Sequence, residues 1–243
     1  MTPAISLVIP CYNEAALLPR LLASVDAARR VFAAGADAVE VIVADNASTD
    51  DTVAVATAHG CRIASTAIRR IGAVRNAGAA IARGALLAFI DGDSSIHPET
   101  FNAIASALSR PDVIGGATGV TMERWSAGIA LTYAAMLPIV WITGMDTGVV
   151  FCRRADFEAV GGYDETMKFA EDVRFLVALR GLGLARGSRL VRARSAKAVA
   201  STRKFDQFGD WHYLPIAWKA PWYLISARAR DGFSDRYWYK SGR

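Results

Sequence analysis

The chain contains few of the residues that build metal centres or disulfide frameworks, with three cysteines and three histidines among 243 residues. Cys11, Cys61 and Cys152 are far apart, and neither a CxxC pair nor a matching histidine pattern accompanies them. This spacing excludes the usual structural zinc sites and favours reduced, buried thiols. The first residues also lack a basic segment followed by a long apolar one, so no secretory signal is expected. We therefore predict a cytoplasmic protein.

Long uncharged stretches are also scarce. Residues 128–145 are the one stretch that resembles a membrane span, because no charged residue occurs in it. Pro138 and Gly144 interrupt this stretch, however, and several polar side chains dilute it. A spanning helix needs about 20 consecutive apolar residues. We expect a buried or membrane-surface helix here. Internal repeats and low-complexity linkers are absent from the sequence.

The composition is that of an ordinary globular protein. Hydrophobic residues make up 53% of the chain and charged residues 21%, which is enough to bury a full core. The formal net charge of +5 favours anionic partners, such as nucleotide phosphates, nucleic acid or an acidic membrane surface. Because no recognised nucleic-acid-binding motif accompanies this charge, we do not expect a nucleic-acid partner.

Hydrophobic patterning predicts that strands alternate with helices through the first ninety residues. A β-branched apolar run predicts a strand at 5–9, and further strands are predicted at 39–44, 61–65 and 85–90. Helical spacing predicts helices at 14–32, 53–58 and 71–83. Such alternation is typical of a mostly parallel sheet covered by helices on both faces. The fold class is therefore α/β, with a Rossmann-like single domain.

Patterning continues less regularly beyond residue 95. We predict helices at 98–108, 155–160 and 170–180, the last ending at Gly181 as a C-cap, and strands at 112–120 and 147–152. The expected outcome is one continuous domain with a C-terminal tail.

Two carboxylates follow the fourth predicted strand. Asp91-Gly92-Asp93 comes directly after the apolar run 85–90. Ligands of open α/β sheets gather at the carboxyl ends of strands, and carboxylate oxygens suit Mg²⁺ or Mn²⁺. The same tripeptide is also ordinary turn chemistry, since aspartate tolerates turns and glycine adopts positive φ angles. Both interpretations are open from this tripeptide alone.

Several segments in a fixed order decide between them. Taken together they resemble the family-2 glycosyltransferases, inverting enzymes of the GT-A fold that use nucleotide-sugar donors. The resemblance runs from Ser6 to about Trp211 and is carried by Val8-Ile-Pro-Cys-Tyr-Asn-Glu14, Val43-Ala-Asp-Asn-Ala-Ser-Thr-Asp50, Gly72-Ala-Val-Arg-Asn-Ala-Gly78, Asp91-Gly-Asp93, Gly161-Gly-Tyr-Asp-Glu165 and Glu171-Asp172. It implies a catalytic domain over 1–210, with a nucleotide-binding half at 1–95 and an acceptor half at 96–210, followed by a tail at 211–243.

The resemblance implies a donor site near the N-terminal strands. Pro10, Tyr12 and Glu14 would line the nucleoside pocket, although Asn13 or Glu14 is also a plausible helix cap. Asp45 would accept a hydrogen bond from the base, which slightly favours a UDP-sugar, with a GDP-sugar as the alternative. The family's frequent Asp-Asp-Gly is replaced here by Asp45-Asn46-Ala47.

Further donor contacts are implied downstream. Arg75, in a segment similar to the family's Arg-Asn-x-Gly, would help to hold the nucleotide. Asp91 would contact the ribose, and the metal through water. Asp93 would ligate a divalent metal, Mg²⁺ or Mn²⁺, that bridges the diphosphate. Arg203 or Lys204 would close over the diphosphate.

Glu171-Asp172 matches the family's acidic pair. The resemblance implies that Asp172 is the general base for the acceptor hydroxyl, while Glu171 orients the acceptor or Asp172. The same acids also suit the N-terminal end of a helix. The motif of processive members is missing, which predicts transfer of a single sugar. The acceptor stays open among a glycan, a lipid carrier and a small molecule. His212 is a weaker candidate for the metal shell.

Residues 211–243 are rich in aromatic and basic side chains, such as Trp218, Trp222, Arg228 and Arg230. This composition is typical of a membrane interface, and packing over the sheet is the alternative. We predict a cytoplasmic protein with this tail as a candidate contact to the cytoplasmic membrane face.

Two other functions are compatible with parts of the sequence. A haloacid-dehalogenase-like phosphatase also places an Asp-x-Asp at a strand end, but after its first core strand, whereas several α/β units precede Asp91 here. The second is a non-catalytic binding or membrane-docking module with a transferase fold. A nucleotidyltransferase does not fit, because it should open with a glycine-rich phosphate loop, and Pro10-Cys-Tyr-Asn-Glu14 is not one.

Overall fold

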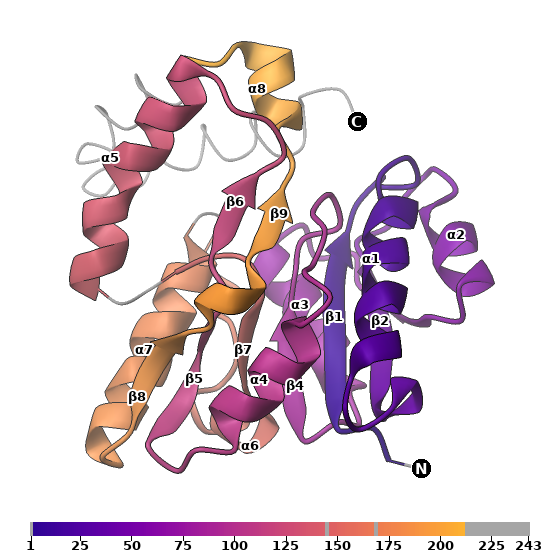
Figure 1. Cartoon of the computed structure of the whole chain (residues 1–243). Coiled ribbons are helices and arrows are strands. Elements are labelled where there is room, and N and C mark those ends of the chain that lie inside the picture. The colour runs from indigo at the N-terminus through magenta and orange to yellow at the C-terminus, as the bar shows by residue number, and fades with distance from the viewer. Residues whose placement is uncertain (1, 144–145, 168–169, 212–243) are drawn as a thin grey trace. The chain divides into compact units, whose positions relative to one another are not determined.

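A seven-stranded sheet is the centre of the computed structural model (Figure 1). The structure describes residues 2–143, 146–167 and 170–211. Two compact units are found, one formed by residues 1–121 with 144–200 and the other by residues 122–143 with 201–243. The domain boundaries predicted at residues 95/96 and 210/211 stay a prediction.

The sheet belongs to the first unit and has the strand order β3-β2-β1-β4-β7-β5-β8. Its strands pair in parallel except at β7, which is antiparallel to both β4 and β5. The strands are β1 Ile5–Cys11, β2 Val39–Asp45, β3 Arg62–Ser65, β4 Leu86–Phe89, β5 Val113–Ala117, β7 Val150–Arg153 and β8 Arg189–Arg192. The predicted mostly parallel α/β architecture is confirmed. A separate two-stranded sheet pairs β6 Val120–Met122 with β9 Ala198–Ala200.

Helices cover both faces of the large sheet. Side chains of β1 alternate between two apolar clusters, as a strand buried on both faces requires, with Leu7 in one and Val8 in the other. The first cluster includes α1 and α4, and the second includes α3, α6 and α7. The helices of this unit are α1 Leu18–Val31, α2 Thr52–Ala58, α3 Ile71–Ala80, α4 Thr100–Leu108, α6 Arg154–Ala159 and α7 Glu171–Ala185, with short 3₁₀ turns at Ala36–Ala38 and Arg194–Ala196.

Pro10 explains why the chain leaves the sheet next to Asp91. The Val8 carbonyl accepts a hydrogen bond from the Ile90 N–H, and the next bond of a parallel ladder would come from the N–H of residue 10. Proline has no N–H, so the β1–β4 ladder stops there. The chain after Ile90 is therefore free to turn away from the sheet.

The predicted end of the last long helix was wrong. We expected a C-cap at Gly181, but α7 continues through Gly181 and ends at Ala185. The left-handed residue that follows the helix is Gly187, with φ +67°. The Ser188 N–H donates to the Gly183 carbonyl and the Gly187 N–H to the Leu184 carbonyl, the two bonds of a Schellman motif. A glycine thus ends this helix one and a half turns later than predicted.

The second unit contains α5 Ala127–Thr143 and α8 Arg203–Phe208. Arg124 donates to the carboxylates of Asp206, at 2.5 Å, and Asp210, at 2.6 Å. Gly128, on α5, lies so close to the Asp210 carbonyl that an added Cβ would be 2.6 Å from its oxygen. These contacts join the chain at the start of α5 to α8 and to the residues that follow α8. Within the part of the chain that the structure describes, no helix combines the length and apolar character needed to cross a bilayer.

Candidate active site

Three strand ends bring the predicted donor residues together. Cys11 and Asp45 are paired residues at the ends of β1 and β2. A Cβ added to Gly92 would lie 3.1 Å from the Cys11 sulfur, 3.4 Å from Cγ of Glu14 and 3.5 Å from the Pro10 carbonyl oxygen. A side chain at this position would press on the end of β1, so glycine suits the position between the two aspartates.

Several carboxylates near these strand ends affect the pKa of the buried Cys11 thiol. Burial raises the pKa of Cys11 well above its usual value, and the carboxylates of Glu14, Asp45 and Asp91 raise it further. The side chain of Glu14 is itself buried. Four predicted site residues, Pro10, Glu14, Asp45 and Asp91, thus surround one position.

The loops after β1 and β2 hold each other in strained conformations. Asn13 and Ala47 have φ angles of +52° and +57°, a region that side chains other than glycine rarely adopt. The Asn13 N–H donates to the Ser48 hydroxyl, and the Thr49 N–H donates to the Asn13 side-chain oxygen. Asn13 therefore bridges two loops. It does not cap α1, which begins at Leu18 without a side-chain cap.

Ala47 stands where the family that the sequence resembles frequently has glycine, and its φ of +57° lies in the region that favours glycine. Beside it, the amide of Asn46 donates to the carbonyls of Thr66 and Ile68, which joins this loop to the chain after β3. The ring of Tyr12 lies under the Arg69 guanidinium, 5.5 Å from its centroid. Hydrogen bonds therefore join the loop after β2 to the chain after β3.

Arg75 links the strand-end acids to the acidic pair on α7. Its guanidinium donates to Asp91 at 2.9 Å and to Glu171 at 2.5 Å. It also lies over the Tyr163 ring, 5.1 Å from the centroid. Burial opposes its charge, but Asp91, Tyr163 and Glu171 outweigh burial and raise the pKa of Arg75. The 8% exposure of its side chain shows a charge held inside the protein.

Glu171 and Asp172 occupy the first turn of α7, as predicted. The preceding Ala170 has φ +58°, the third positive φ outside glycine among the described residues. Burial raises the pKa of Glu171, Arg75 opposes that rise, and the Asp172 and Asp91 carboxylates add to it. Asp172 is more exposed than Glu171, and one of its oxygens accepts the Val173 N–H at 2.8 Å. Two adjacent acids therefore occupy different environments.

The Gly-Gly-Tyr turn packs against α3. The Asn76 amide donates to the Tyr163 carbonyl, and the Asn76 oxygen accepts the Tyr163 N–H, both at 2.9 Å. A Cβ added to Gly72 would lie 3.1 Å from the Asp164 carbonyl oxygen. Asn76 and Gly72 thus position the turn that precedes α7.

Asp93 is held through its main chain. Arg20, on α1, donates to the Asp93 carbonyl oxygen at 2.7 Å. Among the residues that the structure describes, no group of three or more His, Cys, Asp or Glu side chains is arranged to hold a metal ion. The two half-exposed carboxylates of Asp91 and Asp93 offer hard oxygen donors of the kind that Mg²⁺ or Mn²⁺ binds together with substrate phosphates. The donor set fits an ion shared with a ligand.

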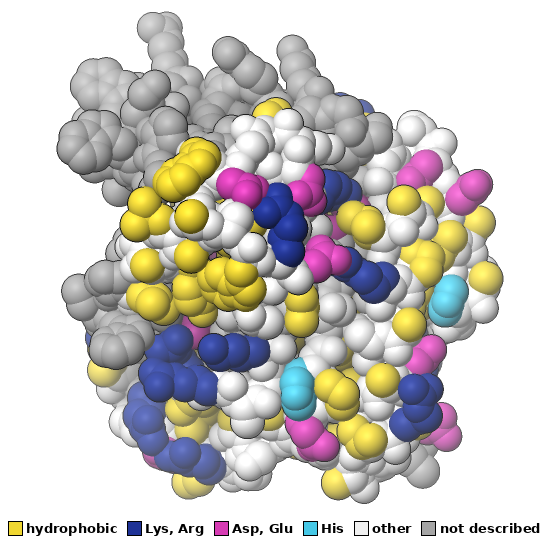
Figure 2. All heavy atoms as spheres, turned by 45° about the horizontal axis from the view of Figure 1, so that its top comes forward, with side chains coloured by type: hydrophobic (Ala, Val, Ile, Leu, Met, Phe, Trp, Pro, Cys, Tyr) yellow, Lys and Arg dark blue, Asp and Glu magenta, His cyan; other side chains and the backbone are white. Residues whose placement is uncertain are grey.

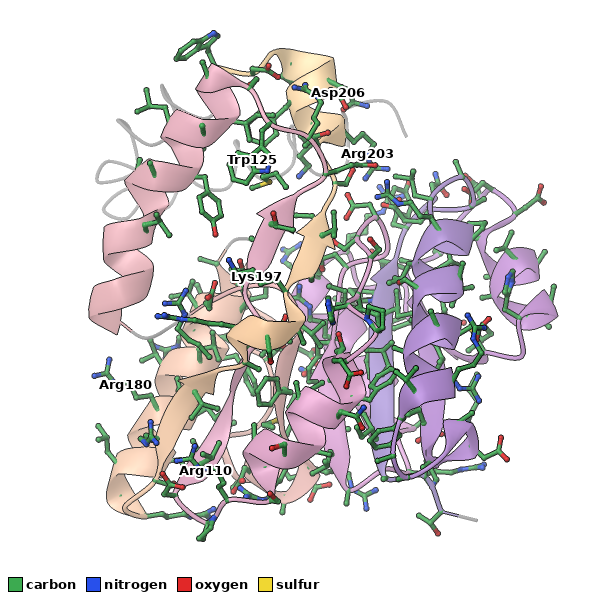
Figure 3. All side chains as sticks on the ribbon, viewed as in Figure 1. Arg110, Trp125, Arg180, Lys197, Arg203 and Asp206 are labelled. Carbon is green, nitrogen blue, oxygen red and sulfur yellow. The ribbon has the colours of Figure 1, made fainter. Side chains whose placement is uncertain are left out.

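Two other predicted site residues are Arg203 and His212. Arg203 begins α8 in the second unit, where Figure 3 labels it, and its main-chain N–H donates to the Ser201 hydroxyl. Its role at the diphosphate stays a prediction. His212 and most of the predicted tail lie outside the described residues.

Sequence patterns missed Arg20 and the central place of Tyr163. Arg20 is an unremarkable cation on a helix, and nothing in its neighbours indicates that it reaches the strand-end turn. Tyr163 lies within a recognised motif, but its fully buried ring and its contact with Arg75 depend on folding. Only a signal from distant segments, such as covariation, would have found either.

The chain belongs to glycosyl transferase family 2, since the model of that family matches residues 6–158. An uncharacterized glycosyltransferase of Mycobacterium tuberculosis is 32% identical over 114 residues, which are 46% of this chain and 48% of that protein. The chain therefore spans about half the length of this curated relative.

Solved structures share the fold. A Staphylococcus aureus TarS fragment, in complex with UDP-GlcNAc, superposes with a TM-score of 0.62 at 19% identity over 81% of this chain and 58% of that one. The mannosyltransferase PcManGT from Pyrobaculum calidifontis, in complex with GDP-Man and Mn²⁺, gives a TM-score of 0.61 at 18% identity over 79% and 55%. The predicted GT-A-type fold is confirmed.

Proposed function

We propose that this protein is an inverting glycosyltransferase that moves one sugar from a nucleoside-diphosphate sugar to an acceptor hydroxyl. One observation carries the proposal. Arg75 joins Asp91, at the carboxyl end of β4, to Glu171, which precedes Asp172 on α7. A site for an anionic donor and a site for a proton acceptor are thereby held together within one unit.

The donor side consists of Pro10, Tyr12, Glu14, Asp45, Asp91 and Asp93. Asp45 would bind the base, Asp91 the ribose, and Asp93 a divalent metal shared with the diphosphate. Similar structures contain UDP-GlcNAc, or GDP-Man with Mn²⁺, so a UDP-sugar or a GDP-sugar is the proposed donor. When bound, such a metal supplies Lewis-acid stabilisation for the departing diphosphate.

The acceptor side consists of Asp172 with Glu171. Asp172 takes the proton of the acceptor hydroxyl while that oxygen attacks the anomeric carbon. The bond from the anomeric carbon to the diphosphate oxygen breaks, and the nucleoside diphosphate leaves with the electron pair. Because attack comes from the face opposite the leaving group, the configuration inverts. Asp172 suits this role better than Glu171, which is buried and bonded to Arg75.

Arg75 is a positioning residue. It acts on the donor indirectly, by holding the Asp91 carboxylate in place. Its guanidinium is occupied by Asp91 and Glu171 and is largely buried. It orients the carboxylate proposed to bind the ribose, and it keeps Glu171 in place beside the base. We also propose cytoplasmic action by this protein, with residues 211–243 as a candidate membrane contact.

Two variants test the two sides of the site separately. Wild type should show a Mn²⁺-dependent rise in melting temperature with a UDP- or GDP-sugar. A ligand 100-fold above its dissociation constant stabilises the folded protein by about 2.7 kcal/mol. Asp93→Ala should lose the metal-dependent part of this shift. Asp172→Asn should keep the shift but lose about 10²-fold or more in donor turnover, because a general base is removed.

Asp37→Ala, an exposed acid on the 3₁₀ turn before β2, is the matched control and should behave as wild type. Full turnover by Asp172→Asn, or an undiminished metal-dependent shift in Asp93→Ala, would refute these assignments. Donor binding without turnover in wild type would favour a binding module. Release of phosphate from a phosphomonoester with Mg²⁺ would favour the phosphatase, which the family match does not support.

A further inference from the structure

A β-turn carries the two aspartates that follow β4. It spans residues 91–94 and is closed by the Ser94 N–H, which donates to the Asp91 carbonyl at 3.1 Å. The next residue, Ser95, exchanges two main-chain hydrogen bonds with Val199 on β9, at 3.0 and 2.8 Å. Main-chain hydrogen bonds therefore fix the path of the chain on the C-terminal side of Asp93.

Helix α1 supports the same segment with two polar side chains. Arg20 donates to the Asp93 carbonyl at 2.7 Å, and the Ser24 hydroxyl accepts the Ile96 N–H at 3.0 Å. Residues four apart lie on the same face of a helix, so both side chains come from one face of α1. The Asp93 carbonyl shares its Cα with the side chain. A hydrogen bond that fixes this carbonyl therefore restricts the positions that the Asp93 carboxylate can reach.

We propose that Arg20 is a positioning residue for the divalent metal and acts through its hydrogen bond to the Asp93 turn. This role rests on the proposed function, in which the Asp93 carboxylate ligates that metal. Mg²⁺ requires near-ideal octahedral geometry, so its ligands must be held in place. Groups that orient a metal ligand commonly contribute about 10- to 100-fold to metal affinity. Because Arg20 bonds to the main chain of Asp93, we expect an effect at the lower end of that range.

The charge of Arg20 predicts a different result from its hydrogen bond. A cation repels a nearby divalent metal and attracts a nearby diphosphate. Through charge alone, Arg20 would weaken metal binding and would strengthen nucleotide binding with or without metal. Figure 2, in which the strand ends at the top of Figure 1 come forward, shows Lys and Arg side chains beside Asp and Glu side chains. Opposite charges offset each other there, so we expect the hydrogen bond to dominate.

Titration of the full chain with Mn²⁺, in the presence of UDP or of GDP, tests this role. The electron paramagnetic resonance signal of free Mn²⁺ gives the bound fraction, so the measurement requires no turnover. Arg20→Met keeps an unbranched side chain but removes its donors. It should raise the Mn²⁺ dissociation constant of the nucleotide complex about tenfold. Calorimetry without metal should give the same nucleotide affinity for Arg20→Met as for wild type.

The matched control is Arg29→Met, because Arg29 is also on α1 and donates to a main-chain carbonyl, that of Ala36, at 3.0 Å. It should bind Mn²⁺ as wild type does. The proposal is overturned if Arg20→Met binds Mn²⁺ as tightly as wild type or more tightly, if its nucleotide affinity falls equally with and without metal, or if Arg29→Met loses as much Mn²⁺ affinity. Loss of Mn²⁺ binding in Asp93→Ala alone would leave the proposed function standing, whereas a wild type that binds no Mn²⁺ would overturn both.

Discussion

At the scale of single residues, strain is concentrated around the candidate site. Among the described residues, the three with positive φ outside glycine are Asn13, Ala47 and Ala170. Each is within two residues of a proposed site residue, namely Tyr12, Asp45 and Glu171. Backbone strain of this kind costs about 1–3 kcal/mol and persists only where surrounding contacts enforce it. The loops are therefore shaped by the site and not by local preference.

Ala47→Gly should raise the free energy of unfolding by about 0.5–1 kcal/mol. Glycine removes the cost of the left-handed conformation at φ +57°. This gain is larger than the free energy that glycine costs through its greater entropy in the unfolded chain. Ala54→Gly, at an exposed position inside α2, should have the opposite sign, a loss of about 1 kcal/mol. Urea unfolding of the three proteins measures both changes. A loss of stability in Ala47→Gly would show that contacts of its methyl group outweigh strain.

Arg75→Gln should cost about 3–5 kcal/mol of stability, because it leaves Glu171 buried without its cation. Glu171→Gln should cost less than Arg75→Gln. The double variant should be at least about 1 kcal/mol more stable than the sum of the single losses predicts, as expected for coupled neighbours. Urea unfolding of all four proteins provides this cycle, with Arg30→Gln as an exposed control. Additive losses would mean that the ion pair contributes no coupling.

At the scale of elements, α7 connects the site to the sheet. Its first turn carries the acidic pair, its inner face packs on the core, and its end is set by Gly187. The position of this end can be tested independently of function.

Gly181→Ala and Gly187→Ala should change stability in opposite directions. Gly181 lies inside α7 with open space around it, so alanine should add about 1 kcal/mol through helix propensity. Gly187 has φ +67°, where alanine should cost about 1–2 kcal/mol. Thermal unfolding of the two variants measures the difference. Destabilisation by Gly181→Ala would indicate instead that the helix ends at Gly181, as the sequence predicted.

At the scale of the whole first unit, one acid ties four strands or their approaches together. Glu40, on β2, accepts hydrogen bonds from Ser6 at 2.5 Å, from Arg62 at 2.8 Å and from the Arg83 N–H at 2.5 Å. Burial alone would raise the pKa of Glu40, but these donors outweigh it and lower the pKa below its usual 4.5. The folded state therefore prefers the ionised carboxylate.

Glu40→Gln should destabilise the protein by about 1.5–3 kcal/mol at neutral pH, the range for hydrogen bonds to a charged group. Because the folded pKa is lowered, this stabilisation is complete above the unfolded pKa and is lost as pH falls through the folded value. The gap between wild type and variant should therefore shrink below about pH 4.5. Urea unfolding across pH measures it, with the exposed Glu158→Gln as control. A gap that stays constant with pH would contradict the lowered pKa.

Local pattern was sufficient to predict much of the fold. Short runs of strand-like residues predicted β1 to β4, and the motif segments predicted the acids at the end of β4 and the start of α7. Short elements such as β6, β8 and β9 went unpredicted, because three or four residues have too little periodicity to stand out. Gly181 was taken for a helix end because glycine commonly marks one, yet the helix continues to Ala185, and Gly183 in this last part is buried against Ile114.

The sequence by itself determined the alternation of strands and helices, the glycine between Asp91 and Asp93, and membership of glycosyl transferase family 2. These depend on neighbouring residues or on ordered motifs. Only the tertiary structure revealed that Arg75 bonds to Asp91 and to Glu171, 96 positions away along the chain. Such a contact is made by folding and not by spacing, because burial removes water and forces the remaining charges to pair.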